Sequence, residues 1–479
     1  MRVSARRAFF ICASYIAFDM SLLSDFLRTL KDEKISSLKK ISFTDREHDA
    51  FMKTVSFVAQ KQFADAALQQ ELKMTKAHFD KMNSILLDKV YAHHTGGEDS
   101  KVLYLLWEKG LYDHLFHEAR VRERRYVKLG NQKKLEVFYR LVFGVTLRLP
   151  ITLNRIEYAE VYAKKFLNTI DKPSEEQRWE IDLMKFWNTV FYKSAHGEMT
   201  TYEPVILSTL KKWEKKLTGK KYSACSFFYW MCWATYYEYY THNFQGWSTA
   251  LENCLREFDK SKKDLGENYR IYVVTKLAIA YSQGNLFKQS LQMYRDAFAK
   301  YEKQLLRNLY HPLMYSIIAL INHDWADAEK MLEAHLIPRL YKFPEESLNF
   351  DIERNCAILY MQKNDFEKAA HYLQLGQQWD KTQISLLGDI LQRMVHNIHF
   401  LLVKDFDTAF TLLTKNKKFL GTKKKDAMVM EYAAVFVLIG DIIRLKKGKK
   451  LPPDFQARLD ALQTGIMKLY GDLLVKALA

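Results

Sequence analysis

The sequence predicts an all-α protein, an α-α hairpin superhelix with an N-terminal helical module and a C-terminal helical cap. Three observations support this prediction. Gly supplies 17 and Pro 8 of the 479 residues, about half the usual share, which leaves few of the tight turns that β-hairpins need. Most apolar residues recur with a helical period instead of alternating. A short motif also recurs about every 40 residues, and a fixed period of this size is typical of helical repeats.

The first 19 residues have two interpretations. Arg2, Arg6 and Arg7 precede the short apolar stretch 8–18, which has the charge pattern of a signal peptide. No cleavage site of the small-x-small type follows this stretch, and an ordinary amphipathic helix pattern begins at Asp19-Met20. We therefore favour a translation start at Met20 over a signal peptide.

Residues 20–100 are predicted to form the N-terminal helical module, and one segment resembles a helix-turn-helix. Thr75 is expected to cap a second helix that begins at Lys76. In a DNA-binding version, the start of that helix enters the major groove, and the contacts would come from Lys76, His78, Lys81 and Asn83. The alternative is a packing module that caps the array, which Lys73 at the usual Gly position of the turn favours.

Residues 101–415 are predicted to hold the helical repeats, which are clearest in their second half. Each copy has an apolar helix, a turn residue, an Asp or Asn, an aromatic residue or Leu, and a small residue. The small residues are Ser290, Ala328, Ala369 and Ala409, which are 38, 41 and 40 residues apart. The expected turn residues are Gly284, His323, Asn364 and Lys404. The Asp or Asn that follows each turn is expected to cap the second helix.

These copies resemble the tetratricopeptide repeat. The best copy runs from Ala357 through Tyr360 and Asn364-Asp365-Phe366 to Ala369. It keeps the small-Tyr-Gly-aromatic-Ala order of that family, with Asn in the Gly place. The period is nearer 40 than the usual ~34, so the resemblance implies a divergent tetratricopeptide-like array. It also implies a concave groove, lined by the first helix of each hairpin, that binds a protein or peptide partner.

Counting back from the turns gives the residues expected to line this groove, which are mostly aromatic or aliphatic. Before Asn243 they are Tyr229, Cys232, Tyr236, Tyr239 and Tyr240; in later copies they are Tyr310, Leu313, Ile317, Leu320, Asp351, Arg354, Ile358, Met361, Leu391, Met394, Ile398 and Leu401. The predicted partner-binding residues are Tyr229, Tyr236, Tyr239, Tyr240 and Arg354. An apolar lining indicates either an open groove for an amphipathic segment or a tight superhelix in which these faces are buried.

Residues 416–479 are predicted to form the C-terminal cap. A lysine-rich loop at 415–425 leads into an apolar helix at 428–445, and a last amphipathic helix is expected at 454–478.

Charge and cysteine usage indicate the class of partner and the cellular compartment of the protein. The net charge of +17 indicates an acidic partner, which can be a nucleic acid, an anionic lipid or an acidic protein. The basic residues are spread along the chain, with local concentrations at Arg120–Lys134, Lys415–Lys425 and Arg444–Lys450, and we favour a solvated basic surface. The five cysteines form no CxxC pair and are interpreted as reduced core residues. No apolar run reaches the ~18 residues of a membrane-spanning helix. We predict a cytoplasmic protein, or a secreted or periplasmic one if residues 1–19 are a true signal peptide.

The sequence contains none of the common catalytic or phosphate-binding motifs. His114/His117 and His396/His399 lie at a spacing that can bind a metal. Apart from Asp113 and Glu118 beside the first pair, no third ligand stands nearby at a recognisable spacing. We therefore predict no enzyme activity, no cofactor and no metal. The predicted function is a non-enzymatic helical-repeat scaffold that binds proteins or peptides. The alternative is a DNA-binding transcriptional regulator whose repeat array senses a partner.

Overall fold

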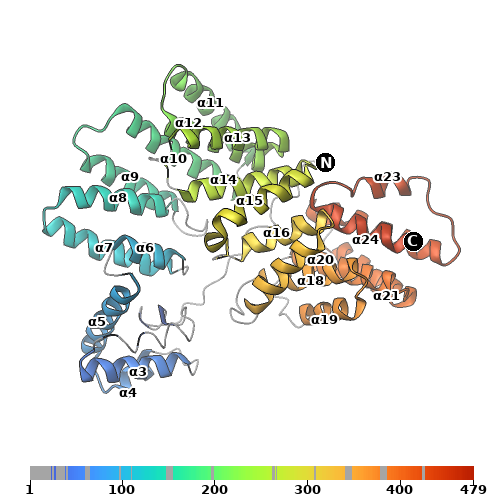
Figure 1. Cartoon of the computed structure of the whole chain (residues 1–479), viewed down its shortest axis with the longest axis horizontal. Helices are drawn as coiled ribbons and strands as arrows, with labels where there is room; N and C mark the ends of the chain where they lie inside the picture. Colours follow the sequence, from blue (N-terminus) through green and yellow to red (C-terminus); the bar gives the residue numbers. More distant parts are fainter. Residues whose placement is uncertain are drawn as a thin grey trace. The chain divides into compact units, whose positions relative to one another are not determined.

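The computed structural model describes most of the chain, and every regular element in the described part is a helix (Figure 1). This confirms the all-α prediction. Residues 1–19 lie outside the described part, which consists of residues 23, 26, 27, 38, 41, 43–59, 65–95, 99–108, 111–146, 155–195, 199–261, 265, 267–306, 309–339, 348–377, 386–422 and 427–479. No helix in these ranges is long and apolar enough to cross a membrane.

The chain divides into two compact units between Thr189 and Val190. Within the N-terminal unit, α6 packs against α7 and α8, and α8 packs against α9. Its helices are α3 (Asp45–Ala59), α4 (Asp65–Glu71), α5 (Lys76–Thr95), α6 (Asp99–Glu108), α7 (Tyr112–Lys128), α8 (Gln132–Thr146), α9 (Arg155–Thr169) and most of α10 (Glu175–Ala195).

The C-terminal unit contains five successive helix pairs, α12/α13 to α20/α21, and each pair packs against the next. The elements of this unit are α11 (Met199–Leu217), α12 (Ser223–Tyr236), η1 (Tyr237–Thr241), α13 (Phe244–Lys260), α14 (Glu267–Gln283), α15 (Phe287–Leu305), α16 (Tyr310–Ile321), α17 (Trp325–Glu329), η2 (Lys330–Leu336), η3 (Ile337–Arg339), α18 (Leu348–Gln362), α19 (Phe366–Gln377), α20 (Leu386–Leu402), α21 (Phe406–Thr422), α22 (Ala427–Lys446), α23 (Phe455–Asp460), η4 (Gly465–Met467) and α24 (Lys468–Leu478).

Each of the five pairs turns at one residue with a left-handed backbone. These residues are His242, Asn285, His323, Asn364 and Lys404, with φ between 51° and 65°. In the last four, the next amide N–H donates to the carbonyl five positions back over 2.8–2.9 Å, the bond that closes a Schellman motif. Gly284 lies in the turn between α14 and α15 as predicted, but it is not the left-handed residue. Its N–H still makes a helical bond to Ala280, so the left-handed position falls one residue later.

The residue after the turn caps the second helix in most pairs. The carboxylates of Asp324, Asp365 and Asp405 accept the N–H three residues later over 3.0–3.1 Å, which satisfies an amide that the helix itself leaves free. Asn243 does the same at 2.9 Å. The exception is α15, where Asn285 forms the turn and Leu286 takes the cap position without a side-chain bond.

The small residues let the two helices of a pair approach closely. Ser290, Ala328, Ala369 and Ala409 are all fully buried. The Ser290 hydroxyl donates to the Ala278 carbonyl of the facing helix over 2.6 Å. A larger side chain at these positions would push the helices apart or strain their rotamers.

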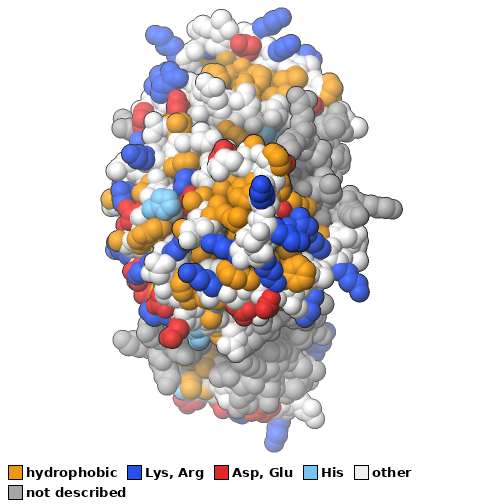
Figure 2. Space-filling view, turned by 90° about the vertical axis from the view of Figure 1, so that its right-hand side faces the viewer, with side chains coloured by type: hydrophobic (Ala, Val, Ile, Leu, Met, Phe, Trp, Pro, Cys, Tyr) orange, Lys and Arg blue, Asp and Glu red, His pale blue; other side chains and the backbone are white. Residues whose placement is uncertain are grey.

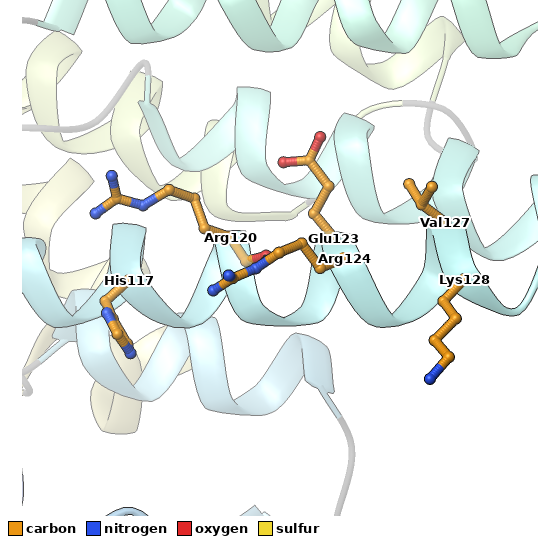
Figure 3. Close-up of a pocket in the computed structure, with 6 residues that line it drawn as sticks. All are labelled: His117, Arg120, Glu123, Arg124, Val127 and Lys128. Carbon is orange, nitrogen blue, oxygen red and sulfur yellow. The ribbon is translucent and has the colours of Figure 1, made fainter. Parts of the chain in front are cut away.

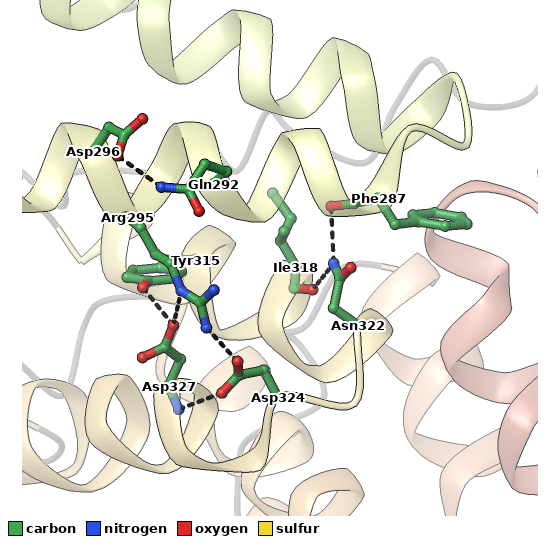
Figure 4. Close-up of polar contacts among 9 residues, drawn as sticks. All are labelled: Phe287, Gln292, Arg295, Asp296, Tyr315, Ile318, Asn322, Asp324 and Asp327. Atoms are coloured by element: carbon green, nitrogen blue, oxygen red, sulfur yellow. Dashed lines mark hydrogen bonds and ion pairs between the residues drawn. The ribbon is translucent and has the colours of Figure 1, made fainter.

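Polar contacts join neighbouring pairs, as Figure 4 shows for α15 and α17. The Arg295 guanidinium of α15 donates to Asp327 over 2.8 Å and also bonds Asp324, the cap of α17. The Tyr315 hydroxyl donates to the same Asp327 carboxylate over 2.7 Å. Arg295 therefore links α15, the second helix of one pair, to the capped start of α17 in the next pair.

The C-terminal segment differs from its prediction in two places. Residues 415–422 continue α21 instead of forming a loop, because Asn416 and Leu420 are buried against the neighbouring helices. The expected last helix is broken at Gly465, whose φ is +51°. The Gly465 N–H donates to the Asn285 side chain over 2.9 Å, so this break brings the chain to the end of α14.

After this break, α24 lies across the first helices of the later pairs. Contacts join α24 to α16 and α20. Near the end of α24, the Lys476 ammonium donates to the carbonyls of Met361 and Gln362 at the end of α18, over 2.8 Å each. A cation there is favourable because the last carbonyls of a helix carry partial negative charge. Figure 2 shows the side of the molecule on which α23 and α24 lie, with hydrophobic side chains in the middle of the face and Lys and Arg around them.

Candidate functional site

Three of the four tyrosines predicted to bind a partner are buried against the preceding helices. Tyr229, Tyr236 and Tyr240 are each 6–7% exposed. The Tyr236 hydroxyl donates to Glu203 of α11 over 2.8 Å, and the Tyr240 hydroxyl donates to the Val190 carbonyl of α10 over 3.3 Å. These side chains therefore hold α12 and η1 against α10 and α11.

Most of the predicted groove positions on α16, α18 and α20 are buried as well, while Tyr310 and Asp351 are half-buried. Arg354 is 6% exposed and pairs with Asp351 over 2.7 Å, and it also interacts with Tyr470 of α24. The remaining aliphatic positions on these helices are Leu313, Ile317, Leu320, Ile358, Met361, Leu391, Met394, Ile398 and Leu401, all at most 8% exposed. The chain's own α22 and α24 pack against α20, and α24 also contacts α16.

Tyr239 lies in a different environment, at a half-buried cluster that three successive first helices share. We call it the Lys276 cluster. It consists of Glu238, Tyr239, Tyr272, Lys276, Tyr310 and His311, which come from η1, α14 and α16. None of these side chains is fully buried, in contrast to the positions beneath α24.

An ion pair lies at the centre of the Lys276 cluster. The Lys276 ammonium donates to Glu238 over 2.6 Å, and the two side chains are 18% and 16% exposed. The same ammonium lies 5.8 Å from the ring centres of both Tyr239 and Trp247, within the range of a cation–π interaction. Tyr239 in turn meets Phe191 of α10 edge to face, with 5.5 Å between ring centres.

The charges around Lys276 determine its protonation. Burial by itself would lower the pKa of Lys276, but the Glu238 carboxylate and the surrounding tyrosines outweigh it and raise the pKa well above its usual value. Burial raises the pKa of Tyr310 to about 12. Burial and the Lys276 cation lower the pKa of His311 to about 4. At neutral pH the cluster thus presents a lysine cation beside neutral phenols and a neutral imidazole.

A π-helical turn positions Glu238 and Tyr239. This turn, η1, follows α12 directly, and single π-helical turns occur frequently at functional sites. Trp233 and Tyr237 stack beside it with 5.3 Å between ring centres. Gly246 leaves room for the Tyr237 ring, because a Cβ atom at Gly246 would lie 2.9 Å from it.

The chemistry of the Lys276 cluster suits binding. A lysine with a raised pKa stays protonated, so it lacks the free lone pair that a nucleophile or a Schiff base requires. The Lys276 ammonium already has a carboxylate partner in Glu238. The cluster therefore offers a partner mainly its tyrosine rings, which pack against aliphatic or aromatic side chains at little cost in entropy.

The repeat spacing predicts Tyr239 and Tyr310 as groove residues but does not identify Lys276 and Tyr272. A signal for Tyr272 exists, since Tyr272 and Tyr310 each lie 13 residues before a left-handed turn residue, Asn285 and His323. No comparable signal identifies Glu238, because the π-helical turn interrupts the regular helical spacing before His242.

The residues of the helix-turn-helix-like segment are mostly exposed. Lys73 adopts the left-handed conformation between α4 and α5, with φ of 51°, and the Thr75 hydroxyl accepts the His78 N–H over 3.4 Å. Lys76, His78 and Lys81 are exposed at the start of α5. Asn83 is 8% exposed, so its side chain is not available for a base contact.

The two histidine pairs show no common arrangement. His114 is buried while His117 is exposed, and His399 is buried beside a half-buried His396. Burial lowers the pKa of His396 to about 4. Within the described residues, no group of three or more His, Cys, Asp or Glu side chains could hold a metal ion.

Comparisons of the chain with protein families, with curated proteins and with solved structures find no match.

Proposed function

We propose that the protein is a non-enzymatic scaffold, a divergent tetratricopeptide-like superhelix whose first helices bind an amphipathic helix of a protein partner. The repeated turn, cap and small residue support the repeat assignment, since each pair of helices uses the same local devices at a period near 40. The Lys276 cluster is the proposed binding surface.

The observation that carries this proposal is the position of α24. This helix buries Leu469, Tyr470, Leu473, Leu474 and Ala477 where the unit packs around α16 and α20. The first helices thus accept an amphipathic helix within the chain itself, which is the helix-in-groove mode of recognition. A partner helix on α12 and α14 would extend the same row and meet the half-buried Lys276 cluster.

Tyrosine substitutions on α14 test the proposal. Full-length protein would be used as bait, and co-purifying proteins would be compared between the wild type and Tyr272→Ala. Because a rigid ring is lost from the proposed surface, we expect the specific partners to be lost or strongly reduced. Tyr281→Ala is a matched control on the same helix, since the Tyr281 hydroxyl bonds Glu252 of α13 over 2.8 Å.

The test of the binding surface is a difference in co-purifying partners between the two variants. Partners retained by Tyr281→Ala and lost by Tyr272→Ala support the Lys276 cluster as the binding surface. An unchanged set of partners for Tyr272→Ala, with an unchanged circular dichroism spectrum, would rule this surface out.

The second candidate function is a DNA-binding regulator. It is favoured by the exposed Lys76, His78 and Lys81 beside a turn whose residue Lys73 takes the left-handed conformation. Duplex DNA should then bind at low ionic strength, weaken steeply with salt, and weaken further with Lys76→Glu. Absence of binding at low ionic strength would remove this candidate.

The proposed location is the cytoplasm. The thiols of Cys225, Cys232, Cys254 and Cys356 are buried and form no disulfide with one another. This supports the proposal, because structural cysteines stay reduced in such a compartment.

A further inference from the structure

The turn between α7 and α8 exposes aliphatic side chains. Gly130 takes a left-handed conformation there, with φ of +60°. On both sides of it the chain leaves Val127, Leu129 and Val137 exposed by 58%, 67% and 65%. Exposed aliphatic side chains are normal when scattered, but three around one turn form a local apolar projection.

Cations surround this apolar turn. Arg124, Lys128, Lys133 and Lys134 are all exposed within six residues of Gly130. Two acidic side chains of α7 have partners within the fold. Glu118 pairs with the buried Arg122, and Glu123 accepts both the Tyr139 hydroxyl at 2.9 Å and the Lys165 ammonium at 2.6 Å.

The result is a surface with an excess of positive charge, on which Glu136 of α8 is a half-buried carboxylate. Because internal partners occupy these two carboxylates of α7, they neutralise little of the positive charge at the turn. The turn between α9 and α10 differs, since Asp171, Lys172 and Glu175 are exposed together. The excess of positive charge is therefore a property of the α7–α8 hairpin and not of every turn in the N-terminal unit.

A cationic recess continues from the turn along α7 (Figure 3). It has a volume of about 690 Å³ and is lined by His117, Arg120, Glu123, Arg124, Val127 and Lys128. All six side chains come from one helix. The recess thus shares Val127 and Lys128 with the apolar turn and adds two arginines behind it.

This combination favours an anionic lipid surface over a single-stranded nucleic acid. Single-stranded nucleic acid is bound by aromatic rings that stack on bases, and the nearby rings of Tyr126, Phe138 and Tyr139 are all at most 9% exposed. Aliphatic side chains within a ring of Lys and Arg instead match the boundary between lipid headgroups and acyl chains. We propose that the α7–α8 turn docks the protein on anionic membranes, independently of the scaffold function.

Cosedimentation with lipid vesicles tests this docking. The full-length protein would be mixed at physiological ionic strength with vesicles of phosphatidylcholine alone, or of phosphatidylcholine and phosphatidylserine. Binding is expected only to the vesicles that contain phosphatidylserine. The double substitution Lys133→Gln and Lys134→Gln should weaken it about thirtyfold, the effect of two cations near an anionic surface.

Two further variants test whether vesicle binding depends on this turn or only on the net positive charge of the protein. Lys211→Gln with Lys212→Gln removes the same charge from exposed positions on α11, and it should leave vesicle binding close to that of the wild type. Leu129→Ser should weaken vesicle binding without changing the fold, because the Leu129 side chain is mostly exposed.

Several outcomes would overturn the proposal. These are no binding to phosphatidylserine vesicles, equal loss for the two lysine pairs, or unchanged binding for Leu129→Ser. Duplex DNA binding that depends on Lys133 and Lys134, without vesicle binding, would assign the surface to nucleic acid instead.

Discussion

Lys404 is a lysine in a backbone conformation that glycine adopts more easily. It forms the turn between α20 and α21 with φ of 64°, and its side chain is exposed. A left-handed conformation costs a residue with a Cβ atom about 1–2 kcal/mol. Replacing it by glycine relieves this strain but adds about 0.5–1 kcal/mol of backbone entropy to the unfolded chain. Lys404→Gly should therefore stabilise the hairpin by about 0.5–1 kcal/mol.

Hydrogen exchange and denaturant unfolding together measure this gain. Amides of α20 and α21 should exchange more slowly in Lys404→Gly, and the unfolding transition of the C-terminal unit should move to higher urea concentration. Lys404→Ala is the matched control, because it removes the same side chain and keeps the Cβ atom. Asn364→Gly should gain less, since asparagine tolerates the left-handed region.

The comparison with alanine decides the reasoning about Lys404. If Lys404→Gly is no more stable than Lys404→Ala, backbone strain at this turn is not significant. The Schellman bond from Asp405 to Phe400, at 2.9 Å, would then set the turn without a conformational cost.

Three other predictions follow from the same structure. Asp365→Ala removes the cap of α19 and should lower the free energy of unfolding, measured with urea, by about 1 kcal/mol. Asp365→Asn keeps a hydrogen-bond acceptor and should lower it only slightly. Equal losses for the two variants would contradict a capping role for Asp365. The pKa of His311 is lowered to about 4 from an ordinary 6.5, so the unfolded chain binds its proton first. Stability should fall as pH decreases from about 6.5 towards 4, and an identical pH profile for His311→Phe would refute this. Gly465→Ala places a Cβ atom in a left-handed conformation, 2.9 Å from the Gln283 side chain. This substitution should lower the free energy of unfolding by about 1–2 kcal/mol and speed amide exchange in α24. Unchanged exchange would show that Gly465 does not hold α24 in place.

The repeated turns could be predicted because their interactions are local. The Schellman bond and the Asp cap each join residues at most five positions apart, and the motif around Asn364 and Asp365 contains both of them next to a left-handed residue. The one difference, at Gly284, follows from the same rule. Two residues that both tolerate the left-handed conformation stand side by side, and the number of helical bonds before them decides which one adopts it.

The candidate site was less predictable because exposure depends on distant segments. Tyr236 and Tyr239 are three positions apart on neighbouring helical turns. One bonds Glu203 of α11, while the other approaches Lys276 of α14. Spacing within a single helix cannot distinguish these two directions, since each is set by helices that come earlier or later in the chain.

The sequence by itself determined the helical class, the period near 40 and the positions of most turns and caps. These follow from backbone conformations and hydrogen bonds that close within a few residues. Only the tertiary structure decided which faces of the first helices are covered. The fold brings α24 onto α16 and α20 and leaves the Lys276 cluster half-buried. Burial beneath α24 depends on contacts between residues more than 100 positions apart, such as Lys476 with Met361, and no local pattern encodes these contacts.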